Sequence, residues 1–223
     1  MISSPFNKNI AFSVKKSGVN SDFVLFPEEK KILSSKAIQK RVQDFYIGRL
    51  AAHCALKKIL GKDNHPILKG QKGEPLWPKK IVGAITHAGD IAIAAVAKTE
   101  DTGGIGVDLE YKNRHISFNI SKRVCTDNEL KWITEIKSEA DTRLKMIFSA
   151  KEAGYKAFYP IEKVFLDFMD AELSWNLQMN CFEGKLLKKA GYNYPEGYEF
   201  IVGCNILENY IFSFICLPSF SIR

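Results

Sequence analysis

The chain has 223 residues, which is enough for one large domain or for two small lobes that share a core. Hydrophobic residues make up 46% and charged residues 26%, so the composition is that of a globular protein and excludes an intrinsically disordered one. The net charge of +7 favours anionic partners such as phosphates, nucleic acid, anionic lipid or acidic proteins, but it is equally compatible with a charge that only aids solubility.

The five cysteines are scattered along the chain and include no CxxC pair. We therefore expect neither a disulfide framework nor a zinc site, and we expect a reducing cytoplasmic location. Residues 1–18 lack an apolar core of signal-peptide length, and no apolar run approaches the roughly 20 residues that span a bilayer. Secretion and membrane insertion are therefore not expected.

The first part of the chain predicts a strand, a long helix and a loop. The strand is expected at 9–14. From Ser35 to Leu60, apolar residues recur at spacings of three, four and seven, which predicts an amphipathic helix that ends at Gly61. The segment 64–80 is rich in Gly, Pro and Lys and is expected to be a loop.

Three apolar runs of strand length follow this loop, at 81–86, 91–97 and 104–110. Short polar turns separate them. The three runs predict one sheet that is buried on at least one face.

The remaining part of the chain predicts two helices and then several strands. The helices are expected at 127–137 and 141–158, and Pro160 is expected to end the second one. Strands are expected within 163–217.

The order of these elements is a helix and strands, followed by helices and strands. This order favours an α+β fold with two similar α+β lobes in one chain. We place the boundary after residue 110, which gives an N-terminal lobe at 1–110 and a C-terminal lobe at 111–223.

The segment GIGVDLE at 104–110 contains two acidic residues, Asp108 and Glu110. Side chains two apart on a strand point to the same face, so the two carboxylates project together, while Val107 and Leu109 face the other side. Adjacent carboxylates repel each other unless a cation lies between them, and Mg²⁺ prefers oxygen ligands of this kind. The motif therefore predicts either a metal site or a strand end that turns into solvent.

The segment FSAKEAGYKAFYP at 148–160 places Glu152 and Lys156 four residues apart on a predicted helix. Such a pair lies on one helix face and is often a surface ion pair. The functional alternative is a third carboxylate for the metal, with an ammonium group that meets charge on a phosphate.

The segment ITHAGD at 85–90 places His87 where a predicted strand leaves the sheet. Ligand contacts are common at such positions, but a half-exposed structural histidine is the alternative.

The predicted helix at 35–60 carries several basic residues, including Lys36, Lys40, Arg41 and Arg49. They form either a solvated face or a phosphate site, since arginine offers a bidentate fork to phosphates. The chain has no P-loop, no GxGxxG or GxSxG motif, and no HExxH or paired-cysteine metal signature.

Taken in order, five motifs resemble those of the 4′-phosphopantetheinyl transferases, of the type that activates siderophore and surfactin-like synthetases. GVDLE at 106–110 and FSAKEAGYK at 148–156 resemble the family patterns G-[IV]-D-[IVL]-E and [WF]-S-x-K-E-[AS]-x-x-K. The upstream family motifs are matched by GRLAAHCAL at 48–56, GEPLWP at 73–78 and ITHA at 85–88. The motifs and their surroundings cover residues 41 to 170 approximately.

This resemblance implies roles for individual residues. The implied Mg²⁺ ligands, with Mn²⁺ as an alternative metal, are Asp108, Glu110 and Glu152. Glu152 and Lys156 are the implied catalytic residues, and Lys156 would contact the phosphate that is cleaved. The residues implied to bind coenzyme A are Arg41, Arg49, Thr86, His87, Lys151 and Lys156.

Four positions depart from the family pattern. Thr86 stands where serine is usual, Ala88 replaces a small polar residue, Phe148 replaces the commoner tryptophan, and Glu74 lies where many relatives carry a lysine near the nucleotide. The last change leaves the local phosphate contacts open.

The family implies transfer of the 4′-phosphopantetheine arm from coenzyme A to a serine of an apo acyl or peptidyl carrier protein, with release of adenosine 3′,5′-bisphosphate. The proton acceptor is either Glu152 or a metal-bound water. A monomer is expected, with neither nucleic acid nor membrane as a partner. The alternatives are a metal-dependent phosphohydrolase of coenzyme A or nucleotides, and a basic module that binds RNA or acidic proteins without catalysis.

Overall fold

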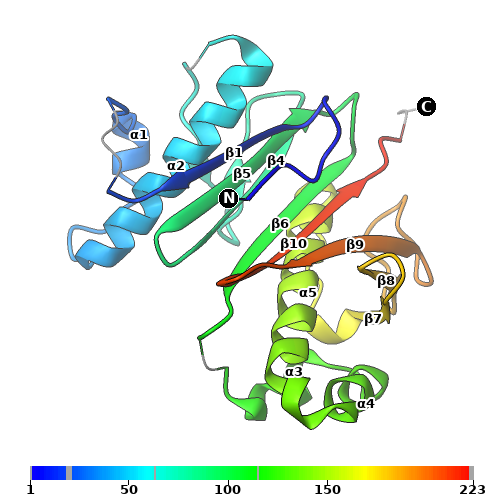
Figure 1. Ribbon diagram of the computed structural model, residues 1–223. Coiled ribbons are helices and arrows are strands. Elements are labelled where there is room, and N and C mark those ends of the chain that lie inside the picture. Colours follow the sequence, from blue (N-terminus) through cyan, green and yellow to red (C-terminus); the bar gives the residue numbers. More distant parts are fainter. Residues whose placement is uncertain (1, 19–21, 63, 115, 221–223) are drawn as a thin grey trace.

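The computed structural model describes residues 2–18, 22–62, 64–114 and 116–220. Its helices and strands are described below as an N-terminal block and a C-terminal block (Figure 1). The N-terminal block consists of β1 (Ala11–Lys16), α1 (Pro27–Lys30), α2 (Gln39–Leu60), β2 (Leu68–Lys69), β3 (Pro75–Leu76), β4 (Ile81–Ala88), β5 (Ile91–Lys98) and β6 (Gly104–Tyr111). The C-terminal block consists of η1 (Phe118–Ile120), α3 (Ser121–Val124), α4 (Asp127–Glu135), η2 (Lys137–Glu139), α5 (Ala140–Glu162), η3 (Phe168–Asp170), β7 (Ala171–Asn176), β8 (Cys181–Leu186), β9 (Glu199–Ile206) and β10 (Tyr210–Leu217).

The longer strands form two antiparallel sheets, which confirms the predicted α+β class. One sheet has the order β1-β5-β4, and the other has the order β6-β10-β9-β8-β7. The prediction of a single sheet from the three apolar runs is wrong, because β6 pairs along its whole length with β10 and belongs to the second sheet. The apolar pattern of a strand indicates burial, but it does not identify a partner that lies far away in the sequence.

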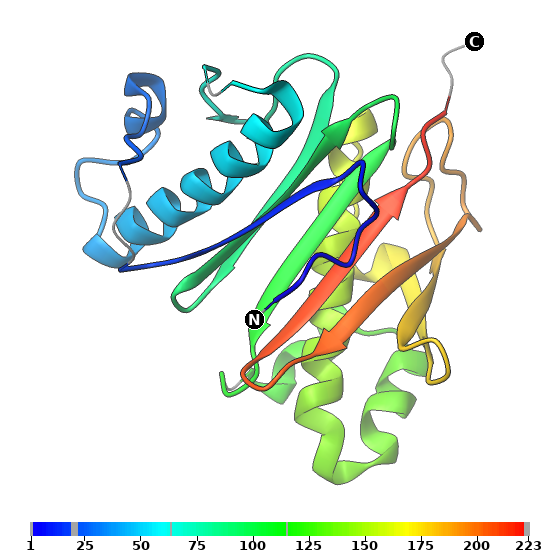
Figure 2. The same ribbon diagram turned by 45° about the horizontal axis from the view of Figure 1, so that its top comes forward.

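The two long helices cover different sheets, as the turned view shows (Figure 2). Helix α2 packs on the three-stranded sheet through small residues such as Ala51 and Ala55, which meet Ala92 and Ala94 of β5 in one buried cluster. Helix α5 packs on β6, β10 and β9 of the second sheet. The sequence therefore predicted the long α2 correctly, apart from its start, which lies at Gln39.

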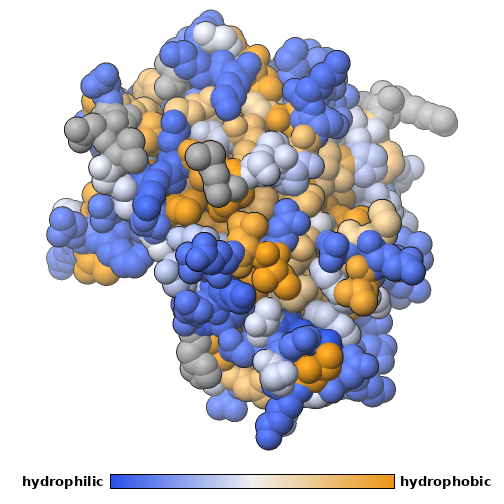
Figure 3. All heavy atoms as spheres, in the orientation of Figure 1, coloured by the Kyte–Doolittle hydropathy of each residue, from blue (hydrophilic) through white to orange (hydrophobic). Residues whose placement is uncertain are grey.

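Strand β6 presents a different chemistry on each of its faces. Ile105, Val107 and Leu109 join a buried cluster with Ile93 and Ala95 of β5, so the two sheets meet through this face. The opposite face carries Gly104, Gly106, Asp108 and Glu110 and lies against α5, as the alternation along a strand predicts. Figure 3 shows the outer side of the region where the sheets meet, with apolar side chains at the centre and hydrophilic ones around the rim.

Glycines allow β6 and α5 to approach closely. A Cβ atom added to Gly106 would overlap the carbonyl oxygen of Ala153, and one added to Gly104 would lie 2.5 Å from the carbonyl oxygen of Ala157. Only glycine fits where a strand backbone lies this close to a helix backbone. The close contact brings the acidic end of β6 beside the middle of α5.

Two predicted boundaries in the second half are wrong. Helix α5 continues through Pro160 to Glu162, because a proline in the last turn removes only one helical hydrogen bond. The helix ends at Lys163, which adopts the left-handed conformation with φ 55°. The segment 164–168, expected as the first strand, contains no strand, and the C-terminal strands begin at Ala171.

The change from one sheet to the other falls between β5 and β6, ahead of the boundary expected after residue 110. The division into lobes 1–110 and 111–223, and the similarity of those lobes, stay predictions. No helix in the described part of the chain combines the length and hydrophobicity that a bilayer crossing requires.

Candidate active site

The site is built where β6 meets α5. Asp108 is 5% exposed and Glu110 is half-buried, and both lie on the face of β6 that is turned toward α5. From α5, Glu152 and Lys156 lie one helical turn apart and both are half-buried. The structure therefore brings together four predicted site residues that are up to 48 positions apart in sequence.

Lys156 connects the helix to the strand. Its ammonium donates to Asp108 Oδ1 at 2.6 Å and to the carbonyl oxygen of Val107 at 3.2 Å. A surface ion pair within the helix, between Lys156 and Glu152, is thus not the contact that the structure shows. The lysine instead holds a buried carboxylate of the neighbouring strand.

Thr86 connects the two sheets at the same carboxylate. The backbone N–H of Leu109 donates to Thr86 Oγ1 at 3.1 Å, and that hydroxyl donates to Asp108 Oδ1 at 3.3 Å. Thr86 is 5% exposed, so these bonds form away from solvent. Thr86, which was expected to bind coenzyme A, thus lies beside the carboxylates and orients Asp108.

Burial and neighbouring negative charge raise the pKa values of Glu110 and Glu152. Burial raises the pKa of Glu110 to about 7, and the negative charges of Asp108 and Glu152 add to this effect. Burial and the charge of Asp108 also raise the pKa of Glu152, although Lys156 lowers it. Such mutual repulsion is relieved by a cation placed among the carboxylates.

The donor set fits a hard divalent cation, although no group of three His, Cys, Asp or Glu side chains among the described residues is already arranged around a common metal position. Asp108 Oδ2 is buried and has no hydrogen-bond partner in the described structure. A buried carboxylate oxygen without a partner is costly, and a metal ion would satisfy it. The ligand set of Asp108, Glu110 and Glu152 stays a prediction that this chemistry supports.

The raised pKa of Glu110 leads us to expect that this residue makes the folded protein less stable at neutral pH than at acidic pH. Its folded-state pKa of about 7 exceeds the ordinary value of 4.5, so its stabilising contribution is complete below pH 4.5 and is lost as the pH rises through 7. With a chelator present, we expect the unfolding free energy to fall from about pH 5 to about pH 8 more steeply for the wild type than for Glu110→Gln. Urea denaturation measures both slopes, and equal slopes would contradict this expectation.

His87 lies at the exposed end of β4, near the first turns of α2. Partial burial lowers the pKa of its ring, and the positive charges of Lys156, Lys40 and Arg41 lower it further, against an opposing effect of Asp44. The positive charges of the predicted residue Arg41 and of Lys156 therefore both act on His87.

Arg49 is the buried member of the predicted phosphate-binding set. It is 7% exposed, its guanidinium lies over the Phe45 ring at 4.6 Å, and its Nε is 3.6 Å from Glu29 Oε1. Nε has no hydrogen-bond partner in the described structure. A buried guanidinium with an unused donor is suited to an anionic ligand.

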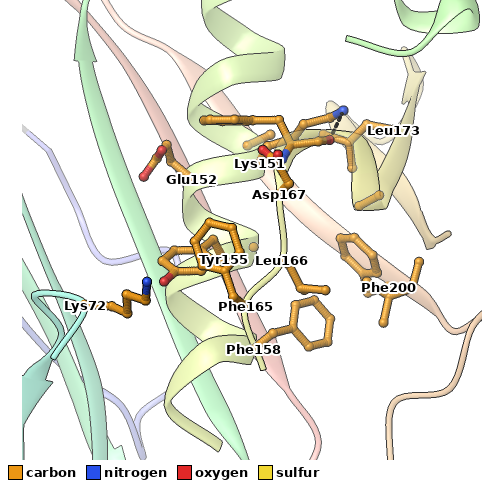
Figure 4. A pocket seen from close by; sticks show the side chains of 15 residues that line it. Lys72, Lys151, Glu152, Tyr155, Phe158, Phe165, Leu166, Asp167, Leu173 and Phe200 are labelled. Carbon is orange, nitrogen blue, oxygen red and sulfur yellow. Dashed lines mark hydrogen bonds between the residues drawn. The ribbon is translucent and has the colours of Figure 1, made fainter. Parts of the chain in front are cut away.

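Lys151 does not join this cluster. Its ammonium donates to Glu129 Oε2 at 2.7 Å, to Phe168 O at 2.7 Å and to Val124 O at 2.8 Å. Figure 4 shows Lys151 and Glu152 leaving α5 on different sides. A lysine has three N–H donors, and all three are used inside the protein, so this geometry gives the predicted coenzyme A contact of Lys151 no support.

Two cavities border Glu152. One, of about 260 Å³, is mostly apolar and includes Tyr155 and Phe165 in its wall (Figure 4), and the other, of about 200 Å³, includes Lys156. Lys72 lines both cavities, and its ammonium lies 5.3 Å from the centre of the Phe165 ring.

Sequence reasoning missed Lys72, since it lies among several lysines in a segment read only as a loop. The loop is fixed by Glu74, which accepts hydrogen bonds from Lys72 N at 3.0 Å and from Lys163 Nζ at 2.8 Å. Glu74, which stands where many relatives carry a lysine, thus connects the loop to the end of α5.

Comparison with protein families agrees with this site. Residues 28–97 match the model for the 4′-phosphopantetheinyl transferase N-terminal domain, and residues 104–198 match the model for the 4′-phosphopantetheinyl transferase superfamily. The second match contains the strand β6 and the helix α5 that build the cluster. The chain belongs to the 4′-phosphopantetheinyl transferase superfamily.

Among its relatives is 4′-phosphopantetheinyl transferase Svp of Streptomyces mobaraensis, with 34% identity over 74% of this chain and 66% of that protein. 4′-Phosphopantetheinyl transferase Npt of Nocardia iowensis is 31% identical over 74% of this chain and 77% of that protein. Enterobactin synthase component D of Escherichia coli (strain K12) is 30% identical over 63% of this chain and 65% of that protein. The chain thus spans just under two thirds of Svp and of component D.

Proposed function

We propose that this chain transfers the 4′-phosphopantetheine arm of coenzyme A to a serine of an apo acyl or peptidyl carrier protein. The reaction releases adenosine 3′,5′-bisphosphate and requires Mg²⁺, with Mn²⁺ as an alternative metal. The observation that carries the proposal is the meeting of Asp108 and Glu110 on β6 with Glu152 and Lys156 on α5, where Lys156 lies 2.6 Å from Asp108. Family membership supports the reaction class.

Asp108, Glu110 and Glu152 are the carboxylates that would hold the metal. When bound, Mg²⁺ would neutralise negative charge on the pyrophosphate as the anhydride bond between its two phosphates breaks and adenosine 3′,5′-bisphosphate leaves. Asp108 is already oriented for this task by Thr86, and its Oδ2 has no other partner in the described structure.

The cationic residues would grip the rest of coenzyme A. Arg49 is stacked on Phe45 and suits the 3′-phosphate, because its Nε has no hydrogen-bond partner in the described structure and only an ion-pair contact with Glu29 at 3.6 Å. His87 suits a coenzyme A phosphate, and Arg41, whose charge acts on His87, would hold the 3′-phosphate together with Arg49. Lys72, in the loop between β2 and β3, lines the smaller cavity together with Glu152 and Lys156.

Glu152 is the residue that would take the proton from the acceptor serine. Its raised pKa makes it a stronger base than an exposed glutamate. Its side chain lines both cavities, and Lys156 lines the smaller one beside it. The larger cavity beside it is mostly apolar, which suits the uncharged pantetheine arm.

The acceptor and the setting also belong to this proposal. Carrier proteins are typically acidic around their serine, so the net charge of +7 favours electrostatic attraction between the partners. One chain supplies every residue named above, which suits a monomer. The five cysteines are free, which suits a reducing cytoplasm.

The test is incubation of the chain with coenzyme A, Mg²⁺ and a panel of apo carrier proteins, followed by intact mass measurement. We expect one carrier to gain a single phosphopantetheine arm, and its serine→alanine variant to stay unmodified. Cleavage of coenzyme A at the full rate without any carrier would identify a phosphohydrolase instead. Tight RNA binding without either reaction would identify a binding module.

A further inference from the structure

The ammonium of Lys156 occupies one oxygen of Asp108, the carboxylate that a metal ion would also use. Asp108 Oδ1 already accepts two hydrogen bonds, one from Lys156 at 2.6 Å and one from Thr86 at 3.3 Å. Lys156 also donates to the carbonyl oxygen of Val107 at 3.2 Å, so its position on β6 is fixed by two acceptors. The strand thus binds a positive charge supplied by the protein itself.

A divalent cation and this ammonium compete for one carboxylate. Both carry positive charge, and at contact distance in a partly buried site their repulsion is a substantial cost. Asp108 is 5% exposed, so water screens the repulsion poorly. A metal that uses Asp108 therefore has to displace Lys156 or to bind weakly beside it.

Lys156 is able to leave Asp108, unlike its neighbour Lys151. Its side chain is 27% exposed, and it borders the cavity of about 200 Å³ that Lys72 and Glu152 also line. A phosphate in that cavity would offer the ammonium a second anionic partner on the same long, flexible stem. Lys151 lacks this freedom because its ammonium has three internal acceptors.

We propose that Lys156 makes metal and coenzyme A binding cooperative: its ammonium competes with the divalent cation for Asp108 until a coenzyme A phosphate draws it away. This inference rests on the proposed function, because it takes the metal and the nucleotide from there. Coupling between two ligands is reciprocal, so the metal should tighten coenzyme A binding by the same factor. Two ligand-dependent positions of one side chain are enough to produce such coupling.

The experiment is a Mn²⁺ titration followed by electron paramagnetic resonance, on the full chain with and without coenzyme A. For the wild type, we expect coenzyme A to tighten Mn²⁺ binding at least about fivefold. For Lys156→Gln, Mn²⁺ binding without coenzyme A should be tighter than in the wild type by a similar factor, and the further tightening by coenzyme A should be smaller than in the wild type. Lys156→Arg retains the charge and should keep the weak binding of the wild type.

Arg114→Gln is the matched control. The charge of Arg114 acts on Glu110 as that of Lys156 does, but no contact joins Arg114 to Asp108 in the described structure. If Arg114→Gln tightens Mn²⁺ binding as much as Lys156→Gln, the effect is one of general charge and direct competition is refuted. Circular dichroism confirms that each variant is folded, and Lys156→Met replaces Lys156→Gln should the latter fail to fold.

The outcomes separate this inference from the proposed function. Mn²⁺ binding that coenzyme A tightens equally in the wild type and in Lys156→Gln overturns the role of Lys156 and leaves the metal site intact. No Mn²⁺ binding in any variant, with coenzyme A present, overturns the metal site and with it this inference.

Discussion

Asp108→Asn is expected to reduce carrier modification by at least about a thousandfold while the protein remains folded. The substitution keeps the shape of the side chain and an oxygen that accepts from Thr86 and Lys156. It removes the negative charge, and with it the attraction for a divalent cation at a position that is 5% exposed. Loss of a metal that offsets transition-state charge raises the activation free energy by several kcal/mol. Each increase of about 1.4 kcal/mol lowers the rate about tenfold.

The measurement is the rate at which a carrier protein gains mass under saturating coenzyme A and Mg²⁺. Asp101→Asn is the control, because Asp101 is exposed in the turn between β5 and β6 and an asparagine keeps its bond to Asn9. Thermal melting reports whether each variant is folded. Turnover of Asp108→Asn close to that of the wild type, in a folded protein, would show that the cluster on β6 and α5 is not the catalytic centre.

The parts of the site that follow from local periodicity were predictable from sequence. The period of two along a strand placed Asp108 and Glu110 on one face, and the structure confirms this. The helical period placed Glu152 and Lys156 one turn apart. Each of these relations depends on residues within five positions of one another, where backbone geometry alone decides the direction of a side chain.

The relations that depend on distant parts of the chain were not predictable in this way. The partner of β6 is β10, about a hundred residues later, and periodicity is silent about such pairing. Lys151 lies beside Glu152 in the sequence, yet its ammonium is bonded to Val124, Glu129 and Phe168. A motif conveys that a lysine is present, whereas the tertiary packing decides which acceptors it meets.

The family resemblance suggested some relations between residues that are distant in sequence. It grouped His87, Arg41 and Arg49 with the carboxylates, although these residues lie far from one another in the sequence. In the structure, the positive charges of Arg41 and Lys156 both lower the pKa of His87. The resemblance offered no account of Glu74, which stands where many relatives have lysine. The structure shows that Glu74 bonds to the end of α5 through Lys163.

The second large effect is expected at Gly106, whose substitution by alanine should destabilise the protein by about 3 kcal/mol or more. The new Cβ would overlap the carbonyl oxygen of Ala153 and would also lie 2.8 Å from Ile215 Cγ2. The first obstacle is backbone in the middle of α5, which has no rotamer to change, so the helix and the strand have to move apart. Urea denaturation measures the loss in unfolding free energy.

Gly154→Ala is the matched control in α5, one residue after Ala153 and outside the contact with β6. A Cβ added to Gly154 meets no atom within 4 Å, and alanine is favoured over glycine inside a helix by about 1 kcal/mol. We therefore expect this variant to be as stable as the wild type or slightly more stable. Equal stability changes for the two alanine variants would show that β6 and α5 are not held at the distance described.

Gly106 also has a consequence for catalysis. Separating β6 from α5 moves Asp108 and Glu110 away from Glu152 and Lys156, and a displacement of about 1 Å in a catalytic group is able to cost about a hundredfold in rate. The folded fraction of Gly106→Ala, assayed well below its melting temperature, should therefore modify a carrier protein far more slowly than the wild type does. Full activity per folded molecule would mean that the four side chains do not need the spacing that these glycines provide.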